Sequence, residues 1–534
     1  MVACTLLDLA CNPPRTDVYG TQWGLEVKPI LICGRLALVG LLCAFAACGG
    51  DGGGSSPPPD GPAQVSTLAY VVTRCHEENG GRNPSLSQAL WIRQGDREPV
   101  KIVEYALGQF AIDGFCRFFG KSRTGYSATI AGGFPRLGVS PDGSLILFEV
   151  TDDFSLNAHV IPEEQQGIFA VRPDGTGLHK VAPHSTDPSF RFYGACPFLF
   201  FDAPRCLVTT TALFDFSRDG RRVVYTDLDP TQTGDEAPQV VTLDVVTGER
   251  QPVTHLPPLP VSPACVGQTT DCVFPSIPPV RLPTFLGATT IAFERGGGTS
   301  VFGGGVFTVK ADGTEEPAAI QTVALPDGTL IPISQITGAP YATQATVPGI
   351  PENGPSPNAG NTISEAFVIE PPNSALLSDG RVLQLTNYGR SDTTFVRIGN
   401  DGQHVFFIAS ENPLGTNPSE QCQWFSIDRL GGDLRQLTFF DIVGDRRRNC
   451  TDPAAPGCSV TAYGELDLIT GALMFASTCD PVGSNPNGIE QLFAMRPDGS
   501  GLTQLTQMPG MIQHADGSLD VETAGPACVP ARHR

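Results

Sequence analysis

The sequence has a small share of charged residues, and basic residues are the scarcer of the two signs. Charged residues make up 17% of the 534 residues, and 34 Lys and Arg stand against 55 Asp and Glu, which gives a formal net charge of −21. A surface of this sign repels a phosphate backbone, which argues against nucleic acid as a partner. The simplest role of the acidic excess is solubility.

Short motifs that mark several enzyme classes are also absent. The chain contains no Gly-x-Ser-x-Gly nucleophile elbow, no His-Glu-x-x-His zinc motif and no Walker A motif. Of its eight histidines, only His179 and His184 have a spacing found in metal ligands, and no Cys-x-x-Cys pair favours zinc. We therefore predict no catalytic residue, no metal site and no cofactor.

Glycine and proline are abundant instead. The chain has 60 Gly and 48 Pro, and hydrophobic residues still make up 40% of it. This mix is typical of an all-β chain with many turns, whereas a disordered chain would be less hydrophobic.

A short apolar segment near the N-terminus predicts export. Arg35 precedes twelve largely apolar residues, 36–47, which is the length of a signal-peptide core and short for a membrane span. The segment FAAC, which ends at Cys48, resembles the lipobox of bacterial lipoproteins, in which the Cys carries the lipid and becomes the mature N-terminus. An ordinary cleaved signal peptide and a transmembrane anchor that begins near Lys28 are the alternatives.

This resemblance divides the N-terminal part of the chain. Residues 1–47 are the expected leader, and residues 48–65 hold the lipidated Cys and a flexible tether rich in Gly, Ser and Pro. Residues 1–27 have no signal-like pattern, so we expect translation to start downstream of Met1. By the same resemblance, a Gly rather than an Asp after the lipidated Cys implies an outer-membrane anchor facing the periplasm or the cell surface.

Cysteine usage agrees with an oxidising compartment. Of the sixteen Cys, eleven follow the tether, and three pairs of them lie close enough in sequence to close short loops. A further pair, Cys422 and Cys479, lies in two matching segments and could join neighbouring repeats. Because eleven is an odd number, either one of these thiols is unpaired or one of the expected pairings is wrong. The three close pairs are Cys196/Cys206, Cys265/Cys272 and Cys450/Cys458.

One pattern returns along the chain. QLFAMRPDGSGLTQLT at 491–506 has a close counterpart, GIFAVRPDGTGLHKVA, at 167–182, and weaker copies occur between them and before them. Each copy is predicted to be a strand, a tight Asp-Gly turn and a second strand. A further hairpin precedes most copies, as in LGVSPDGSLILFEV at 137–150. Two hairpins in series form a four-stranded sheet, which in repetition is the blade of a β-propeller.

The SPDG and RPDG turns resemble the TolB-type (PD40) repeat, a WD40-like family that includes the TolB propeller and the propeller domains of prolyl oligopeptidase-like enzymes. The resemblance implies an all-β fold: a propeller of six to seven four-stranded blades, with seven favoured, over 66–521, and a tail at 522–534. The expected blades lie near 66–105, 137–182, 214–255, 285–320, 321–387, 395–440 and 461–507.

The two faces of such a propeller are predicted to differ. If the strands of a blade are labelled A to D from the centre outwards, the A–B and C–D turns share one face and the B–C and D–A loops share the other. In this chain the first set is mostly short Asp-Gly turns, whereas the second set holds the long, Cys-bearing segments. We call these the turn face and the loop face, and we expect function on the loop face.

Two B–C loops match one another. ASENPLGTNPSEQCQWFSID at 409–428 parallels ASTCDPVGSNPNGIEQLFAM at 476–495, with a shared Pro-x-Gly-Ser/Thr-Asn-Pro core. Two interpretations remain open. The core is a turn scaffold, or it is a repeated binding element that presents Asn417 and Asn485 near the mouth of the channel.

The sequence therefore favours a non-catalytic envelope lipoprotein that binds a protein or peptide through its loop face, in the TolB manner. The alternative is a propeller enzyme or carbohydrate-binding protein, similar to a lyase or a glycosidase, that acts at the channel mouth. The candidate residues there are Asp227, Asp229, Glu411 and Asp480.

Overall fold

The computed structural model describes most of the chain between residues 61 and 531, all within one compact unit, Asp60–Arg534. The leader, Cys48, Cys196, Cys206, Cys265 and Cys272 lie outside the described residues. The described residues are 61–109, 116, 136–151, 161–185, 212–229, 238–256, 280–286, 288–295, 305–320, 322–324, 330–336, 341–348, 362–370, 381–389, 391–399, 401–440, 450, 458 and 460–531.

The strands in the described part form seven sheets of four or five strands, almost all antiparallel, which we call blades 1 to 7 in chain order. Blade 1 holds β1 (Thr67–Glu78), β2 (Arg82–Gln94), β3 (Val100–Gln109), β30 (Gly510–Gln513) and β31 (Leu519–Cys528). Blade 2 holds β4 (Arg136–Val139), β5 (Ile146–Val150), β6 (Gly167–Val171), β7 (His179–Ala182) and β8 (Ala212–Leu213). Blade 3 holds β9 (Asp215–Phe216), β10 (Arg222–Asp227), β11 (Gln239–Asp244) and β12 (Arg250–Pro252).

Blade 4 holds β13 (Arg281–Leu286), β14 (Thr290–Arg295), β15 (Gly305–Lys310) and β16 (Ala318–Ile320). Blade 5 holds β17 (Thr322–Ala324), β18 (Leu330–Ile336), β19 (Tyr341–Pro348), β20 (Thr362–Glu370) and β21 (Arg381–Gln384). Blade 6 holds β22 (Thr394–Ile398), β23 (His404–Ala409), β24 (Gln423–Asp428) and β25 (Arg435–Gln436). Blade 7 holds β26 (Val460–Leu466), β27 (Leu473–Ser477), β28 (Gln491–Met495) and β29 (Thr503–Gln504).

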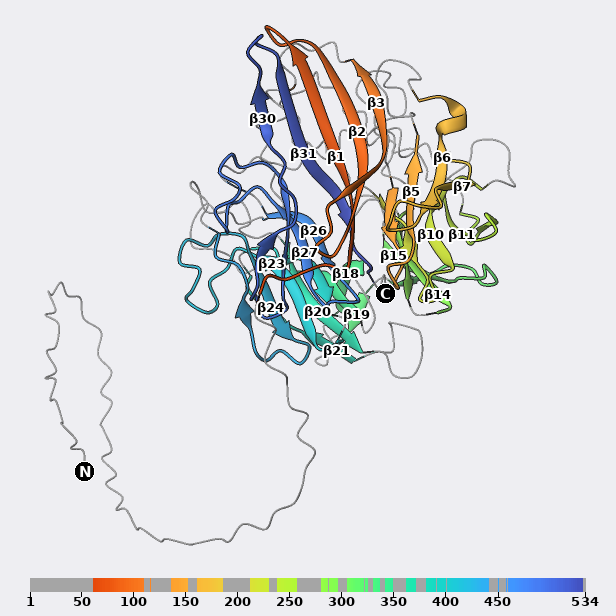
Figure 1. Cartoon of the computed structure of the whole chain (residues 1–534). Helices are drawn as coiled ribbons and strands as arrows, with labels where there is room; N and C mark the ends of the chain where they lie inside the picture. Colours follow the sequence, from red (N-terminus) through yellow and green to blue (C-terminus); the bar gives the residue numbers. More distant parts are fainter. Residues whose placement is uncertain are drawn as a thin grey trace, which may run out of the picture. The chain divides into compact units, whose positions relative to one another are not determined.

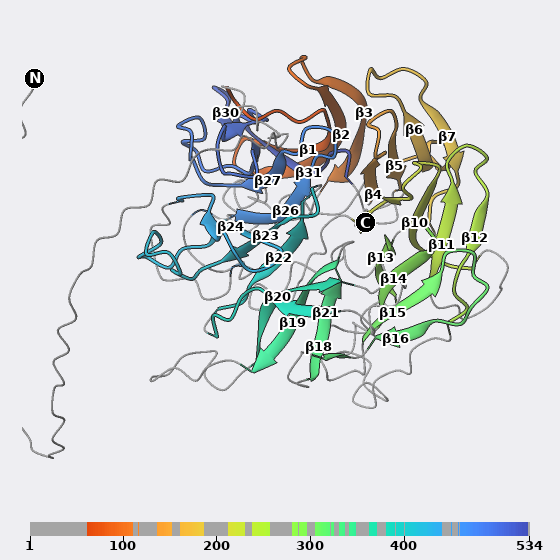
Figure 2. The same ribbon diagram turned by 90° about the horizontal axis from the view of Figure 1, so that it is seen from below.

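The blades stand around a common centre (Figure 2), so the predicted all-β propeller is confirmed. A short 3-10 turn, η2 (Glu163–Gln165), is the one helical element of more than a single residue in the described part. No helix among the described residues is long and apolar enough to cross a membrane.

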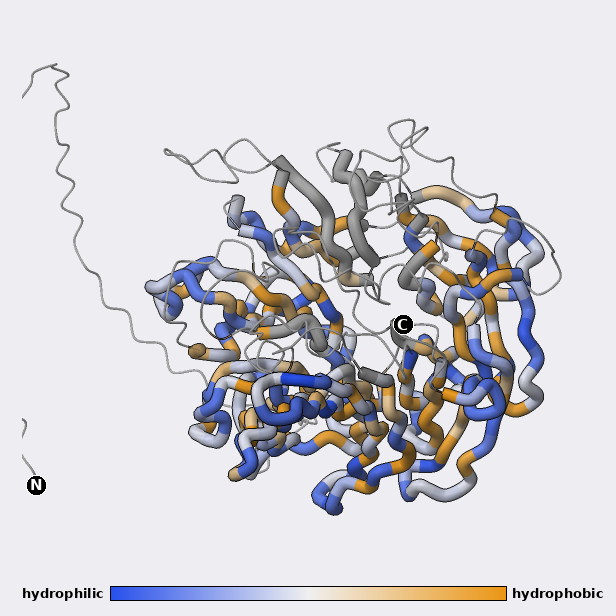
Figure 3. The backbone as a smooth tube through the Cα atoms, turned by 90° about the horizontal axis from the view of Figure 1, so that it is seen from above, coloured by the Kyte–Doolittle hydropathy of each residue, from blue (hydrophilic) through white to orange (hydrophobic). Residues whose placement is uncertain are grey.

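Side chains along a middle strand point alternately to its two faces, and this alternation builds the core between the blades. In β28, Leu492 and Ala494 pack in a cluster with Tyr70 of blade 1, whereas Phe493 and Met495 pack in a cluster with residues of blade 6. Both faces of the strand are therefore buried, and each large side chain buried in this way contributes about 1.5–3 kcal/mol. Figure 3 shows hydrophobic segments in orange interspersed with hydrophilic segments in blue around the ring.

The Asp-Gly turns close the hairpins as the repeat predicts. The Asp174 carboxylate accepts hydrogen bonds from the backbone N–H and the hydroxyl of Thr176, and Gly175 has a φ of 81°. These hydrogen bonds hold the pKa of Asp174 below its ordinary value. Asp498 accepts the N–H of Ser500 in the same way. The two copies of the repeat are thus the C–D hairpins of blades 2 and 7.

The turns of neighbouring blades lie against one another, which places them on one face. A Cβ added at Gly175 would lie 3.6 Å from Val100 of blade 1, and one at Gly143 would lie 3.1 Å from Ile469 of blade 7. Likewise, Gly220 of blade 3 faces Pro141 of blade 2. The turns of blades 7, 1, 2 and 3 therefore share one face, the predicted turn face.

The two ends of the propeller meet in blade 1. β31 pairs with β1 in antiparallel register, and the sheet order is β3-β2-β1-β31-β30. The closing strand runs to Cys528, which lies beyond the expected end of the propeller at residue 521. The next residue, Val529, donates its N–H to Glu465 of blade 7, so the chain beyond the closing strand still contacts the neighbouring blade at this point.

Blade 1 is taller than the others. β1, β2, β3, β30 and β31 rise together beyond the other sheets in Figure 1. The β1–β2 connection at 79–81 is a B–C connection, so this extension lies on the loop face. Closure by pairing also covers strand edges that an open sheet would expose.

Candidate functional site

The best-described part of the loop face lies over blades 6 and 7. It consists of the two matching B–C loops, 410–422 and 478–490, and of two cysteines, Cys450 and Cys458, in the connection between the blades. We call this region the paired loops.

Two disulfides hold the paired loops together. Cys422 of the blade 6 loop is bonded to Cys450, with a Cα–Cα distance of 5.6 Å. Cys458 is bonded to Cys479 of the blade 7 loop, with a Cα–Cα distance of 4.8 Å. The connection between the blades is therefore tied at two points, one to each loop.

These bonds correct two predicted pairings. Cys450 and Cys458 are each in a disulfide, but not with one another, and Cys422 is not bonded to Cys479. The reason is geometric. Cys450 lies within bonding distance of the blade 6 loop and Cys458 within bonding distance of the blade 7 loop, so each faces a different loop rather than its neighbour in sequence.

The structure also contains a pairing that the sequence did not suggest. Cys75 in β1 is bonded to Cys116 over a sequence separation of 41. Cys528 is the free cysteine of the described residues, and burial raises the pKa of its thiol well above the ordinary value.

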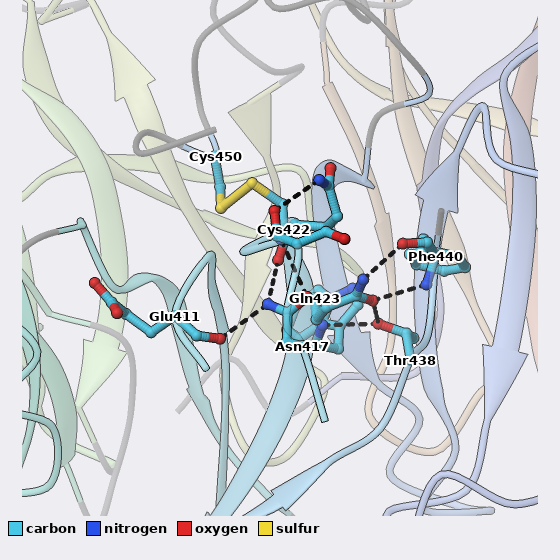
Figure 4. The surroundings of a disulfide bond; sticks show 10 residues. Glu411, Asn417, Cys422, Gln423, Thr438, Phe440 and Cys450 are labelled. Carbon is cyan, nitrogen blue, oxygen red and sulfur yellow. Dashed lines mark hydrogen bonds between the residues drawn. A yellow bond between two sulfur atoms is a disulfide. The ribbon is translucent and has the colours of Figure 1, made fainter. Parts of the chain in front are cut away.

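Asn417 is a scaffold of the blade 6 loop (Figure 4). Its Nδ2 donates to the carbonyl oxygens of Glu411 and Gln421, each at 2.8 Å, and its Oδ1 accepts the N–H of Gln421 at 3.0 Å. The side chain is buried, so its amide is turned into the loop rather than toward the solvent.

Asn485 does the same in the blade 7 loop. Its Nδ2 donates to the carbonyl oxygens of Cys479 and Ile489, at 3.0 and 2.7 Å, and its side chain is buried. Its N–H donates to the Asp480 carboxylate at 2.7 Å. Both Asn residues thus satisfy the backbone groups of a tight loop, as the scaffold interpretation predicts.

A repeated side-chain clasp supports the base of each loop. In blade 6, the Thr438 hydroxyl donates to Gln423 Oε1 at 2.8 Å and accepts the N–H of Trp424 at 2.9 Å. Gln423 also exchanges two hydrogen bonds with the backbone of Phe440, seen in Figure 4. We call this arrangement the Gln–Thr clasp.

The clasp recurs in two further blades with the same bonds. Gln239 and Thr254 form it in blade 3, and Gln491 and Thr506 form it in blade 7. In blade 5, Glu365 takes the place of the Gln and accepts the N–H groups of Tyr388 and Gly389. Burial raises the pKa of Glu365 above its ordinary value.

The paired loops expose apolar side chains at matching positions. Leu414 and Val482 each follow the first Pro of the shared core, and their side chains are 43% and 41% exposed. Phe439, next to the clasp of blade 6, is 67% exposed. A rigid loop that holds an apolar side chain in solvent is suited to contact with another macromolecule.

Two of the predicted acidic candidates, Asp227 and Asp229, form hydrogen bonds or ion pairs within the fold. Asp227 is buried and accepts hydrogen bonds from Arg250 and Ser185 at 3.0 and 3.1 Å. Asp229 is buried beside His255, whose Nδ1 lies 3.1 Å from its carboxylate.

Glu411 and Asp480 belong to the paired loops. The carbonyl oxygen of Glu411 accepts from Asn417, and the carboxylate of Asp480 accepts from Asn485. The described residues contain no group of three or more His, Cys, Asp or Glu side chains that could hold a metal ion.

The sequence did not predict two polar clusters that the structure contains. Arg136 of β4 is buried, forms an ion pair with Glu149 at 2.5 Å and donates to the carbonyl oxygen of Thr226 at 2.6 Å, so it joins blades 2 and 3. No local pattern marks it, because its partners come from other parts of the chain.

The second cluster lies on the tall part of blade 1. Asp520 of β31 lies 2.7 Å from His76 Nδ1 and 2.8 Å from His514 Nε2. Burial raises the pKa of Asp520, but hydrogen bonds from the two imidazoles outweigh that effect and keep the pKa below its ordinary value.

Comparison with known proteins leaves the family open. No family model matches the chain, and no curated protein matches it significantly. Matching solved structures include an oligogalacturonate lyase in complex with manganese, with a TM-score of 0.41 and 11% identity over 79% of this chain and 90% of that chain. TolB from Acinetobacter baumannii matches with a TM-score of 0.29 and 12% identity over 87% of this chain and 66% of that one. The β-propeller domain of the Trilobed protease from Pyrococcus furiosus matches with a TM-score of 0.39 and 12% identity over 84% and 97%. The chain is a β-propeller by its own seven sheets.

Proposed function

We propose that the chain is a non-catalytic scaffold that binds a protein or peptide partner through its loop face. The observation that carries this proposal is the construction of the paired loops. Two disulfides and two buried Asn residues make these loops rigid, and the rigid loops hold Leu414 and Val482 in solvent.

Rigidity supports a binding role because ordering costs free energy on association. A loop that is already ordered loses less conformational entropy when a partner binds, and more of the contact energy remains as affinity. Apolar anchors surrounded by polar atoms are the usual centres of such interfaces.

The proposal includes location. The lipobox-like FAAC segment supports a lipid anchor at Cys48 in a bacterial envelope, with the outer membrane as destination. Disulfides in the described part support an oxidising compartment.

The test is cross-linking in the native envelope, followed by detergent extraction and mass spectrometry of the captured proteins. Double replacement of Leu414 and Val482 by Asp should abolish one specific cross-linked partner and leave folding intact. Leu430→Asp, at an exposed Leu of the turn face, is the matched control and should keep that partner. Loss of the same partner in both variants, or in neither, would contradict the assignment of the loop face.

A further inference from the structure

The first described residues enter the propeller at the turn face. Arg496 donates to the carbonyl oxygen of Gly61 at 2.7 Å, and Ala63 donates its N–H to the carbonyl oxygen of Gly501 at 2.7 Å. Arg496 and Gly501 flank the C–D turn of blade 7.

The next residues continue along the same face. Gln64 donates to Asp96 of the C–D turn of blade 1 at 2.9 Å, and the Ser66 hydroxyl donates to Asp467 of the A–B turn of blade 7 at 3.0 Å. Residues 61–66 therefore run between the turns of blades 7 and 1, which places Gly61, the first described residue, at the turn face.

The length of chain before this point is short. Twelve residues, 49–60, separate Cys48 from Gly61. A Gly/Ser/Pro-rich coil of that length spans about 20 Å on average, and its fully extended limit is about 40 Å. A lipid on Cys48 would thus keep the turn face near the bilayer.

The turn face also carries apolar side chains at its tips. They come from the turns of blades 1, 2, 3, 6 and 7 and are between 44% and 79% exposed. Apolar side chains at separate turn tips can enter the interfacial zone of a bilayer without any rearrangement of the propeller. These residues are Val100, Leu178, Val246, Leu430 and Ile469.

We propose that the turn face is a membrane-facing surface, which rests on a bilayer through its apolar turn tips while the loop face points away. The inference rests on the proposed lipid anchor at Cys48, and it adds the orientation of the propeller and a lipid partner for the face that the proposed function leaves unused.

The test is photo-cross-linking of the full-length, lipidated chain to lipid, in vesicles of phosphatidylethanolamine and phosphatidylglycerol. A photoreactive amino acid is placed at Leu178 or Ile469 on the turn face, or at Leu414 or Val482 on the loop face. We expect at least fivefold more lipid adducts from the turn-face positions. Equal adducts from both faces, or an excess from the loop face, would overturn the orientation.

Two double variants distinguish the contribution of the turn tips to lipid contact from that of the loop face. With the photoreactive group at Leu178, replacement of Val246 and Leu430 by Asp should lower lipid adducts severalfold, whereas Asp at Leu414 and Val482 should not. Unchanged adducts in the first variant would refute a direct role of the turn tips.

The anchor and the partner have their own readouts. Cys48→Ser should release the chain from the membrane fraction, and full retention of this variant would remove the anchor and this proposal together. Loss of partner capture by the loop-face variant, with lipid adducts unchanged, reports on the proposed function alone.

Discussion

The Gln–Thr clasp of blade 6 allows a stability prediction from individual bonds. Thr438→Val keeps the size of the side chain and removes the hydroxyl that Trp424 N–H and Gln423 Oε1 share. Gln423 Oε1 retains a second donor, the N–H of Phe440, at 3.0 Å. The Trp424 N–H is left without its side-chain acceptor inside the core, since all three residues of the clasp are buried.

The magnitude follows from that one unsatisfied group. A buried donor without an acceptor costs about 1–3 kcal/mol, and 1.4 kcal/mol corresponds to a factor of ten in an equilibrium constant. If the clasp opens locally, exchange of the Trp424 amide hydrogen should therefore accelerate by about 5- to 150-fold.

Hydrogen exchange read by mass spectrometry on peptides across β24 measures this effect, with denaturant unfolding as the global readout. Thr289→Val removes a hydroxyl from an exposed turn of blade 4 and is the matched control. Thr506→Val should reproduce the effect in blade 7. If Thr438→Val leaves both the amide exchange and the unfolding midpoint at their original values, the clasp does not stabilise the blade.

Three further changes are predicted from the same contacts. Arg136→Ala leaves the Glu149 carboxylate buried without its ion-pair partner, which should cost about 3–5 kcal/mol in denaturant unfolding; a loss below 1 kcal/mol would argue against the pair. Burial raises the pKa of Glu490 from an ordinary value of 4.5 to about 8, so between these pH values the folded chain holds a proton that the unfolded chain has lost, and stability falls as pH rises through that window. Glu490→Gln should flatten this part of the pH profile of the melting temperature, and an unchanged profile would count against it. Cys450→Ser opens the bond to Cys422, whose 28-residue separation corresponds to about 3–4 kcal/mol of chain entropy, and non-reducing unfolding should show that loss.

The fold was accessible from the sequence because each of its signals is local. A turn such as Ser140-Pro-Asp-Gly acts within five residues, where Asp142 accepts the N–H of Ser144, and strand alternation acts within a single strand. Repetition then forces the blades to stack, since a strand such as β28 has apolar side chains on both faces. The end of the closing strand is harder to predict, because β31 is defined by its pairing with β1 at the far end of the chain.

The disulfides show where local reasoning stops. A short sequence separation lowers the entropic cost of closing the loop, and for this reason the sequence favours a bond between Cys450 and Cys458. The fold gives a different pairing, because the blade 6 loop holds Cys422 beside Cys450 and the blade 7 loop holds Cys479 beside Cys458. Pairing thus depends on the spacing of blades around the ring, which no window of sequence contains.

The paired loops illustrate the same distinction for the site. Repetition drew attention to Asn417 and Asn485, yet both side chains are buried and hydrogen-bonded to their own loops. A residue that recurs in each copy of a repeat tends to stabilise the structure that the copies share, which here is the loop. Leu414 and Val482 differ from one another in size but stand in solvent at the same place on that loop. If the loop face binds a partner, selectivity should therefore follow these two side chains, and exchanging them, Leu414→Val with Val482→Leu, should change affinity while the loops keep their structure.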